Sequence, residues 1–356
     1  ATGMIGDPSG KTEERQLLSK EQIEKNIAGQ KLQLERLLDF GINNRPILVN
    51  NADWLCEYSL VDFLRDIGKH FSVNALIARE SVRRRLEDRE HGISYTEFSY
   101  NLLQACDYLH LYDTYGCRLQ VGGSDQWGNI VAGMDLIRRL RGEETYGLTF
   151  PLLTKADGSK FGKSESGNVW LNPDYTSPYK FYQFFINQAD DDMPRLLRLL
   201  TELSRNEIAE LEEKTRTVPE QRAAQRRLAI ELTRLVHGET EAQEAERASQ
   251  AIFGGDLTGL SASVLEEVFS EVPSASLPSK YIDENRPLVD VLVEAAVFPS
   301  KGEARRMIQS GGVYVNNTRV QENDTKLSQS LLCSGNLIII RVGKKQYYLL
   351  RFEKTS

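Results

Sequence analysis

A glycine-rich segment near the beginning of the chain carries two cations that could meet an anionic ligand. The segment is GDPSGK at residues 6–11, and Arg15 follows Lys11 by four residues. It approaches the phosphate-binding pattern GxxxxGK[ST], but that pattern requires glycine where this sequence has Ile5. This spacing argues against a P-loop NTPase and favours a flexible loop that presents Lys11 and Arg15 to an anionic group. The alternative is a solvated turn.

A second pair of cations lies in KFGKS at residues 160–164, within a stretch of small and polar residues. Lys160 and Lys163 flank a glycine, and Ser164 follows them. Two ammonium groups on such a loop can neutralise charge that develops on a departing pyrophosphate. The alternative is a surface loop with two solubilising lysines.

A third candidate site is GGSDQ at residues 122–126, where a short apolar run meets a helix-like run. Glycines such as Gly123 let the backbone approach a ligand closely, and the acidic Asp125 is suited to ribose hydroxyls. The alternative is a simple strand-to-helix turn with Ser124 or Asp125 as the N-cap.

Tyr100, Gln104 and Asp107 form a polar stripe in an otherwise apolar helical stretch. At about 100° per residue, positions i, i+4 and i+7 fall within about 60° of arc, so the three side chains share one helix face. A phenol, an amide and a carboxylate on a mostly buried helix could line a pocket for a small zwitterion that carries a hydroxyl group. The alternative is a polar stripe that faces solvent.

The elements that must position these motifs alternate as strand, glycine turn and helix over residues 1–190. This alternation predicts a parallel sheet with helices on both faces, and ligands bind such sheets where strands end and helices begin. The predicted strands are 47–50 and 118–121, and the predicted helices are 21–40, 96–112 and 125–140.

Two regions of different character follow. Residues 191–237 lack glycine and repeat leucine at helical spacing, which predicts a helical domain. Residues 254–285 are predicted to form loops around one short helix at 263–270. Residues 286–356 are predicted to form a small α+β module with helices at 288–298 and 301–310 and strands at 313–316, 337–342 and 346–352.

Charge is spread unevenly along the 356 residues. The net charge is −7, yet residues 287–356 hold ten Lys and Arg against six Asp and Glu, so this basic tail carries +4 and the rest carries −11. Cations grouped on a small module are suited to RNA phosphates. The candidate RNA-binding residues are Arg305, Arg306, Arg341, Lys344 and Lys345.

Composition excludes several classes of protein. The sequence is 40% hydrophobic and 27% charged, which argues against a disordered or collagen-like chain. No stretch approaches the ~18 uncharged apolar residues of a membrane span, so we expect no membrane partner. Four separated cysteines without a CxxC pair fit a reducing, cytosol-like compartment, and four scattered histidines predict no metal site.

Together and in this order, the motifs resemble those of bacterial-type tyrosyl-tRNA synthetase, a class I aminoacyl-tRNA synthetase. The resemblance covers essentially the whole chain and includes GDPSGK, FSYNLLQACD, QVGGSDQWGN, TKADGSKFGKSE and TSPYKFYQF. KFGKS is similar to the family's KMSKS loop. The resemblance implies an α/β fold with a Rossmann-like parallel-sheet catalytic domain (1–190), a helical anticodon-binding domain with a linker (191–285) and an S4-like RNA-binding domain (286–356).

The resemblance also implies how the amino acid is bound. Tyr100, Gln104 and Asp7 would hold the ammonium group of L-tyrosine, and Asp107 would accept a hydrogen bond from the tyrosine hydroxyl. Gln120 and Gln126 would line the amino-acid end of the pocket.

By the same resemblance, the tyrosine carboxylate attacks the α-phosphate of ATP, and the tyrosyl group then moves to the terminal ribose of tRNA(Tyr). Gly123, Asp125 and Lys163 would bind ATP, with Asp125 on the ribose, and Mg²⁺ would accompany ATP rather than occupy a protein cage. The departing pyrophosphate would be stabilised by Lys160, Lys163, Ser164, Lys11 and Arg15. The family further implies a homodimer in the cytoplasm or an organellar matrix.

One family signature, HxGH, does not occur in the sequence. Because Ala1 opens almost directly on a glycine-rich loop, we expect the segment with this signature to precede Ala1, and we expect this chain alone to be a poor or inactive enzyme. The alternative function is a non-catalytic RNA-binding protein such as a splicing cofactor, against which Lys160, Lys163 and Asp107 argue. Tryptophanyl-tRNA synthetase is the nearest rival within the class, and Asp107 favours a hydroxylated ring.

Overall fold

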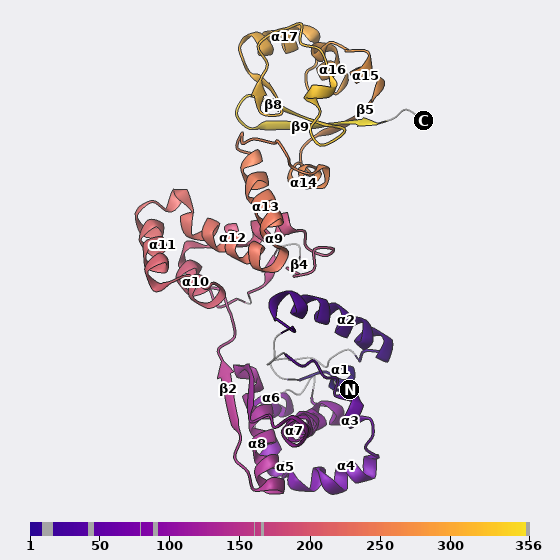
Figure 1. Cartoon of the computed structure of the whole chain (residues 1–356), viewed down its shortest axis with the longest axis vertical. Coiled ribbons are helices and arrows are strands. Elements are labelled where there is room, and N and C mark those ends of the chain that lie inside the picture. The colour runs from indigo at the N-terminus through magenta and orange to yellow at the C-terminus, as the bar shows by residue number, and fades with distance from the viewer. Residues whose placement is uncertain are drawn as a thin grey trace. The chain divides into compact units, whose positions relative to one another are not determined.

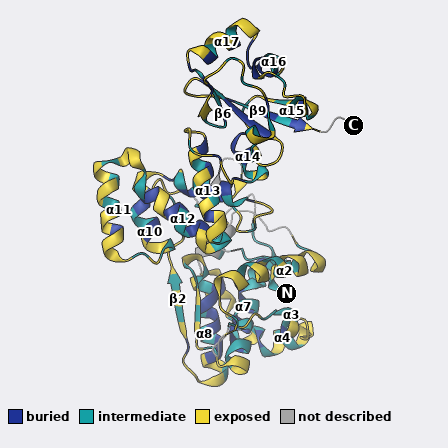
Figure 2. Cartoon of the chain, turned by 45° about the horizontal axis from the view of Figure 1, so that its top comes forward, coloured by how far each residue is buried: buried dark blue, intermediate teal, exposed yellow. Residues whose placement is uncertain are grey.

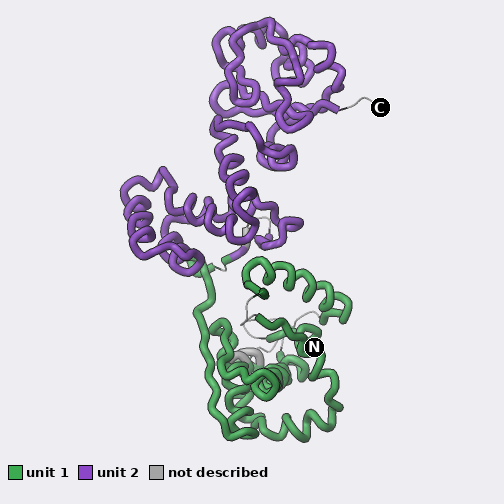
Figure 3. Tube along the Cα trace, viewed as in Figure 1, with its two compact units in different colours: residues 1–161 green, residues 162–356 purple. Residues whose placement is uncertain are grey.

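The chain divides into two compact units, residues 1–161 and residues 162–356 (Figure 3). The computed structural model describes residues 1–8, 17–41, 46–78, 80–87, 92–159, 161–164 and 167–353, with the backbone alone for residues 80, 81, 84, 85, 163 and 164. Lys11, Arg15 and Lys160 therefore lie outside the described residues. Among the described helices, none has the length and apolar character needed to cross a membrane.

In its described residues, the first unit combines helices with one pair of parallel strands (Figure 1). Strand β1 (Leu119–Gly123) pairs in parallel with β2 (Tyr146–Phe150), and α8 (Trp127–Arg141) connects them. Helix α7 (Tyr95–Tyr115) packs against α8. The other elements are α1 (Thr2–Ile5), α2 (Lys20–Leu37), α3 (Ala52–Leu55), α4 (Leu60–Asp66), η1 (Gly68–His70), α5 (Val73–Ile77), α6 (Glu80–Glu87) and η2 (Ser124–Gln126).

Helix α7 begins and ends at strong sequence signals. The Ser94 hydroxyl accepts a hydrogen bond from the Glu97 backbone N–H, and the Glu97 carboxylate accepts one from the Ser94 N–H. The helix ends at Gly116, whose φ of 66° lies in the left-handed region that favours glycine. The predicted helix at 96–112 is thus confirmed and extends slightly further at both ends.

Helix α8 covers one face of the β1–β2 pair. A Cβ on Gly147 would lie 2.7 Å from a side-chain carbon of Ile130, so glycine at this position permits the close approach of the helix. The opposite face carries exposed apolar side chains, and the predicted second layer of helices is not found among the described residues. These side chains are Leu119, Val121, Tyr146, Leu148 and Phe150.

The predicted strand at residues 47–50 is wrong. The structure gives these residues no regular secondary structure, and no described strand pairs with them. Ile47 and Leu48 are exposed, so their apolar character does not reflect a place in a buried sheet. A strand requires a hydrogen-bonded neighbour, and a short apolar run alone does not guarantee one.

The second unit contains a helical region and a C-terminal sheet. Helices α9 (Pro178–Ile186), α12 (Ala223–His237) and α13 (Glu239–Ala251) pack against one another. The other elements of the region are β3 (Lys163–Ser164), β4 (Gly167–Asn168), η3 (Asp190–Asp192), α10 (Met193–Leu200), α11 (Arg205–Thr217) and η4 (Pro219–Gln221). The predicted helical character of residues 191–237 is confirmed by α10, α11 and α12.

We call residues 274–353 the C-terminal module. Its five strands follow the order β5-β9-β8-β6-β7, with β5 parallel to β9 and the other pairs antiparallel. Its elements are β5 (Ser274–Pro278), α15 (Lys280–Asp283), α16 (Leu288–Glu294), α17 (Lys301–Gln309), β6 (Val313–Val315), β7 (Thr318–Arg319), η5 (Gln329–Leu331), β8 (Leu337–Val342) and β9 (Gln346–Glu353).

Strand β5 and helix α15 correct the prediction that residues 254–285 form loops around one helix. That helix is present as α14 (Ala262–Val268). The sequence of β5 is SASLP, which lacks the alternation of apolar and polar residues and ends in proline. Such a strand is tolerated at a sheet edge, where β5 lies, and it gives little signal in the sequence.

The central strand β8 is buried on both faces, and Figure 2 shows buried residues in its neighbour β9. Ile338 and Ile340 pack in a core with residues of α16 and α17. Leu337 and Ile339 pack in a separate core with Ala248 and Ala251 of α13 and with residues of α14. A continuous apolar run is typical of a strand that is covered on both sides.

Candidate active site

Asp107 lies on α7 and receives two hydrogen bonds from the segment at α3. Asn51 Nδ2 donates to Asp107 Oδ2 at 2.9 Å, and Trp54 Nε1 donates to Asp107 Oδ1 at 2.8 Å. The Trp54 ring stacks on His110 with 4.2 Å between ring centroids. Burial raises the pKa of the Asp107 carboxyl above its ordinary value, and the two hydrogen bonds oppose that shift. The carboxylate is therefore held in one orientation and retains lone pairs for a further donor.

Tyr100 and Gln104 precede Asp107 on α7, and all three side chains are half-buried. The residues around them on the helix are buried, including Leu102, Ala105 and Leu109. The polar stripe predicted from the sequence thus lies on a helix embedded in the first unit.

A chain of amides connects Asp7 to α7. Gln126 Nε2 donates to Asp7 Oδ2 at 2.5 Å, and Gln126 Oε1 accepts from Asn129 Nδ2 at 3.3 Å. Asn101 Nδ2 of α7 then donates to Asn129 Oδ1 at 2.8 Å. These hydrogen bonds link Asp7 and Gln126 to α7 at Asn101, the residue that follows Tyr100.

The GGSDQ turn lies at the end of β1, and side chains lie close to its second glycine. A Cβ on Gly123 would lie 2.6 Å from Asp125 Oδ1 and 3.0 Å from Leu152, so a larger residue here would require these two side chains to move. Asp125 itself is exposed. An exposed carboxylate at the carboxyl end of a parallel strand is positioned where nucleotide riboses bind in α/β sheets.

Gln120 on β1 carries a buried acceptor, Oε1, that has no hydrogen-bond donor within the described part of the chain. Buried polar atoms in native proteins are nearly always paired, so this acceptor is available to a ligand that donates a hydrogen bond.

The KFGKS segment is described only in part. Its last two residues form β3, which pairs with β4 as a two-residue antiparallel ladder, and Gly162 before them has a φ of 88°. Lys163 and Ser164 belong to the second unit, whereas the polar stripe and the GGSDQ turn belong to the first.

The five cations predicted to bind RNA do not share one environment. Arg305 and Arg306 on α17 are exposed, as are Lys344 and Lys345 in the turn between β8 and β9. Arg341 is instead half-buried, and its guanidinium carbon lies 3.8 Å from the centroid of the Tyr314 ring.

Four residues of the site escaped the sequence analysis, namely Asn51, Trp54, Asn101 and Asn129. Two asparagines in apolar helices were the available signal, because a buried amide needs a partner. Asn51 and Trp54 are more than 50 positions from Asp107 and gave no local signal.

Two family models match consecutive parts of the chain. Residues 1–254 match the model described as tRNA synthetases class I (W and Y). Residues 264–350 match the model described as Tyrosine--tRNA ligase SYY-like C-terminal domain.

Relatives match over nearly the whole chain. Tyrosine--tRNA ligase of Roseiflexus castenholzii is 52% identical over 352 residues, which cover 98% of this chain and 83% of that protein. Tyrosine--tRNA ligase of Geobacillus kaustophilus is 52% identical over 356 residues, covering 99% and 83%.

Among solved structures, a C-terminally truncated mitochondrial tyrosyl-tRNA synthetase of Aspergillus nidulans matches with a TM-score of 0.59 and 31% identity, covering 71% of this chain and 74% of that chain. The corresponding protein of Coccidioides posadasii matches with a TM-score of 0.56 and 32% identity, covering 69% and 71%. The chain belongs to the tyrosyl-tRNA synthetase family of class I aminoacyl-tRNA synthetases.

Proposed function

We propose that this protein is a tyrosine–tRNA ligase that activates L-tyrosine with ATP and transfers it to tRNA(Tyr). Its family supports this function, and one observation carries the choice of amino acid. Asp107 shares one face of α7 with Tyr100 and Gln104. Hydrogen bonds from Asn51 and Trp54 fix the orientation of its carboxylate. A desolvated carboxylate with free lone pairs is suited to accept a hydrogen bond from a phenol, and phenylalanine has no side-chain donor to supply one.

In this proposal the stripe and the amide chain bind the two ends of tyrosine. Asp107 accepts from the hydroxyl, while Tyr100, Gln104 and Asp7 surround the ammonium group. Gln120 and Gln126 line the amino-acid end. The orphaned Oε1 of Gln120 and the hydrogen bond from Gln126 to Asp7 support this assignment.

ATP would bind at the GGSDQ turn, with Asp125 on the ribose and the backbone of Gly123 close to the nucleotide. The tyrosine carboxylate displaces pyrophosphate from the α-phosphate, so no protein nucleophile takes part. Lys160, Lys163 and Ser164, together with Lys11 and Arg15, would stabilise the charge on the departing pyrophosphate. Mg²⁺ enters with ATP in this proposal.

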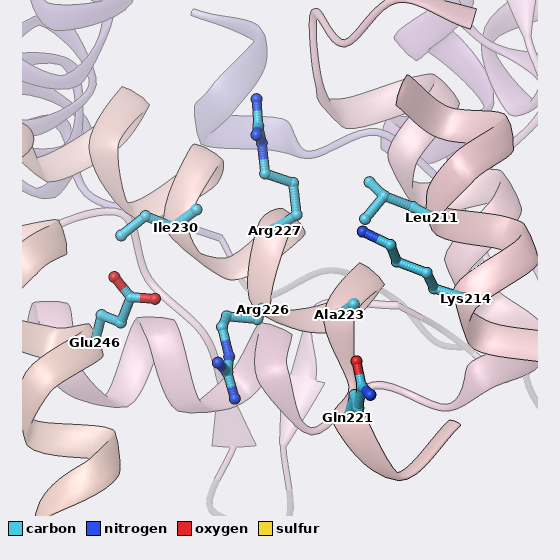
Figure 4. A pocket seen from close by; sticks show the side chains of 8 residues that line it. All are labelled: Leu211, Lys214, Gln221, Ala223, Arg226, Arg227, Ile230 and Glu246. Atoms are coloured by element: carbon cyan, nitrogen blue, oxygen red, sulfur yellow. The ribbon is translucent and has the colours of Figure 1, made fainter. Parts of the chain in front are cut away.

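The second unit would bind the tRNA. A groove of about 550 Å³ in the helical region is lined by Lys214, Arg226 and Arg227, with Glu246 among the lining residues (Figure 4). Arg227 is partly neutralised, because Glu231 lies 2.8 Å from it. Residues 191–285 would act as the anticodon-binding domain, and the exposed cations of the C-terminal module would contact phosphates.

A homodimer in the cytoplasm completes the proposal. Helices α4 and α5 expose Leu60, Val61 and Val73, with exposed fractions of 74%, 71% and 58%. An apolar surface of this kind is typical of a contact between subunits. Analytical ultracentrifugation of wild-type protein and of Val61→Asp would test it, with dissociation expected for the variant.

The function is tested by amino-acid-dependent ATP–pyrophosphate exchange with each of the twenty amino acids, in the full-length protein. We expect exchange with tyrosine alone. Exchange with tryptophan would contradict the role of Asp107, and no exchange with any amino acid, combined with binding of RNA, would favour the non-catalytic RNA-binding alternative.

A further inference from the structure

The end of α13 is capped by side chains from the C-terminal module. The last carbonyl groups of a helix have no donors within the helix. Asn317 Nδ2 donates to the carbonyl of Ala251 at 3.0 Å and to that of Gly255 at 2.8 Å. The Tyr347 hydroxyl donates to the carbonyl of Ile252 at 2.7 Å. Two residues far along the chain therefore satisfy three carbonyls at and just beyond the helix end.

Arg341 adds a cation to the same junction. Its guanidinium stacks on Tyr314 and lies 3.9 Å from the position that a Cβ on Gly254 would occupy. Its Nε is buried and has no acceptor among the described residues. A cation near the last turn of a helix is favoured by the helix dipole. The surroundings of Arg341 are thus those of a residue within the junction, unlike the exposed Lys344 and Lys345.

The backbone on both sides of the junction is specialised. Asn317 has a φ of 63°, in the left-handed region that asparagine tolerates better than most residues. Gly254 has a φ of 88°, and a Cβ on Gly255 would lie 2.9 Å from the Gln250 carbonyl oxygen. The turn after α13 therefore needs glycine at a left-handed position and at a crowded one, and the turn between β6 and β7 needs a residue that tolerates the left-handed conformation.

We propose that Asn317, Tyr347 and Arg341 are positioning residues for the charging of tRNA. They fix the C-terminal module on the end of α13, so that the cations of the module and those of the helical region face one RNA in a fixed relation. The apolar contacts beneath, such as Phe269 with Tyr347, are non-directional, whereas the hydrogen bonds define the orientation. This inference rests on the proposed function.

Variants of two adjacent asparagines separate positioning from general stability. Asn317→Gly keeps the left-handed backbone and removes the cap, and Asn317→Asp places a carboxylate opposite two carbonyl oxygens. Asn316→Gly is the matched control, because Asn316 also has a positive φ but bonds to Leu331 and Ile339 inside the module.

Three readouts are needed in the full-length protein: KM and kcat for aminoacylation of tRNA(Tyr), tyrosine-dependent pyrophosphate exchange, and hydrogen exchange of amides 250–258. We expect Asn317→Gly to raise KM for tRNA about fivefold to tenfold, as the loss of one or two hydrogen bonds implies, with unchanged pyrophosphate exchange and faster hydrogen exchange. Asn317→Asp should have a larger effect. Asn316→Gly should leave KM within about twofold of wild type.

Two results would overturn the proposal. One is faster hydrogen exchange at 250–258 in the Asn317 variants with no rise in KM beyond that of Asn316→Gly. The other is unchanged hydrogen exchange there, which would show that the cap does not form in solution. Tyr347→Phe keeps the ring and removes only the hydroxyl. If an Asn317 variant fails to fold, the same three readouts are measured on Tyr347→Phe. A wild-type protein without tyrosine-dependent exchange would contradict the proposed function instead, and the hydrogen-exchange comparison needs no substrate.

Discussion

Strands β2 and β8 are both short and apolar, and they differ in what covers them. Tyr146, Leu148 and Phe150 on one face of β2 are 56%, 44% and 57% exposed, whereas the first four residues of β8 are completely buried. In the first unit, the candidate site consists of polar side chains joined by hydrogen bonds. In the second unit, the exposed cations of the C-terminal module lie on a domain whose sheet packs against an apolar core on each face. This difference predicts that substitutions in the first unit change chemistry and selectivity, whereas changes in the C-terminal module alter RNA binding and stability.

The largest effect on tRNA charging should come from deleting residues 286–356, which hold most of the cations of the C-terminal module. Deletion of residues 286–356 should lower tRNA charging by about 10³ or more at moderate salt while pyrophosphate exchange stays near wild type, because phosphate contacts dominate RNA affinity. The measurement is both activities on the same truncated protein at two salt concentrations. Because this deletion uncovers Leu265 and Phe269, a deletion from residue 257 onward is the matched control for exposed apolar surface. Loss of both activities in both truncations would show a structural role, and retained charging would make the tail dispensable.

Lys163→Ala tests the chemistry of adenylate formation. We expect the rate to fall by about 10²–10³, the usual effect of losing one group that stabilises transition-state charge, while tyrosine affinity is preserved. Pre-steady-state kinetics with varied tyrosine separates the two quantities, and Lys155→Ala in the same segment is the control. An unchanged rate with weakened tyrosine binding would contradict the assigned role.

Asp107→Asn tests the selectivity of the first unit. Tyrosyl-tRNA synthetases reject phenylalanine by ~10⁵, a value established for this enzyme family itself. The variant's preference for tyrosine over phenylalanine should fall about 10²-fold. The reason is that the amide introduced by Asp107→Asn offers one acceptor oxygen to Asn51 and Trp54, where the carboxylate offered two. The ratio of kcat/KM for the two amino acids measures it. Asp113 lies on the same helix but pairs with Arg141 at the surface, so Asp113→Asn is the control and should leave the preference unchanged. An unaltered preference in folded Asp107→Asn would show that Asp107 does not line the tyrosine pocket.

The smallest expected effect is on stability, and it is measured by making the same valine-to-alanine substitution in each of the two sheets. Val342→Ala in β8 should lower the free energy of unfolding by about 1.5 kcal/mol, the value for two buried methylene-sized groups. Val121→Ala in β1 should change it by less than about 0.5 kcal/mol, because Val121 is 52% exposed. Denaturant titration of both variants gives the comparison. Equal destabilisation by the two would show that the open face of β1 is covered in solution.

The sequence was informative where a local signal decides the structure. The capping box and terminal glycine define α7, and the continuous apolar run defines β8. The predicted strand at 47–50 failed because pairing depends on a neighbour that no local pattern reports, and β5 was missed because SASLP lacks alternation. In the site, helical spacing placed Tyr100, Gln104 and Asp107 on one face. The donors to Asp107 come from a distant segment and could be found only from the fold.

The direct test of the central claim is a single-turnover transfer experiment. The full-length protein is incubated with ATP and radiolabelled tyrosine, freed of unbound substrates and mixed with tRNA(Tyr) without further ATP. We predict that a stable tyrosyl-adenylate complex forms and that its label moves to the tRNA 3′ end. Failure to retain adenylate with tyrosine, or retention with a different amino acid, would contradict the account.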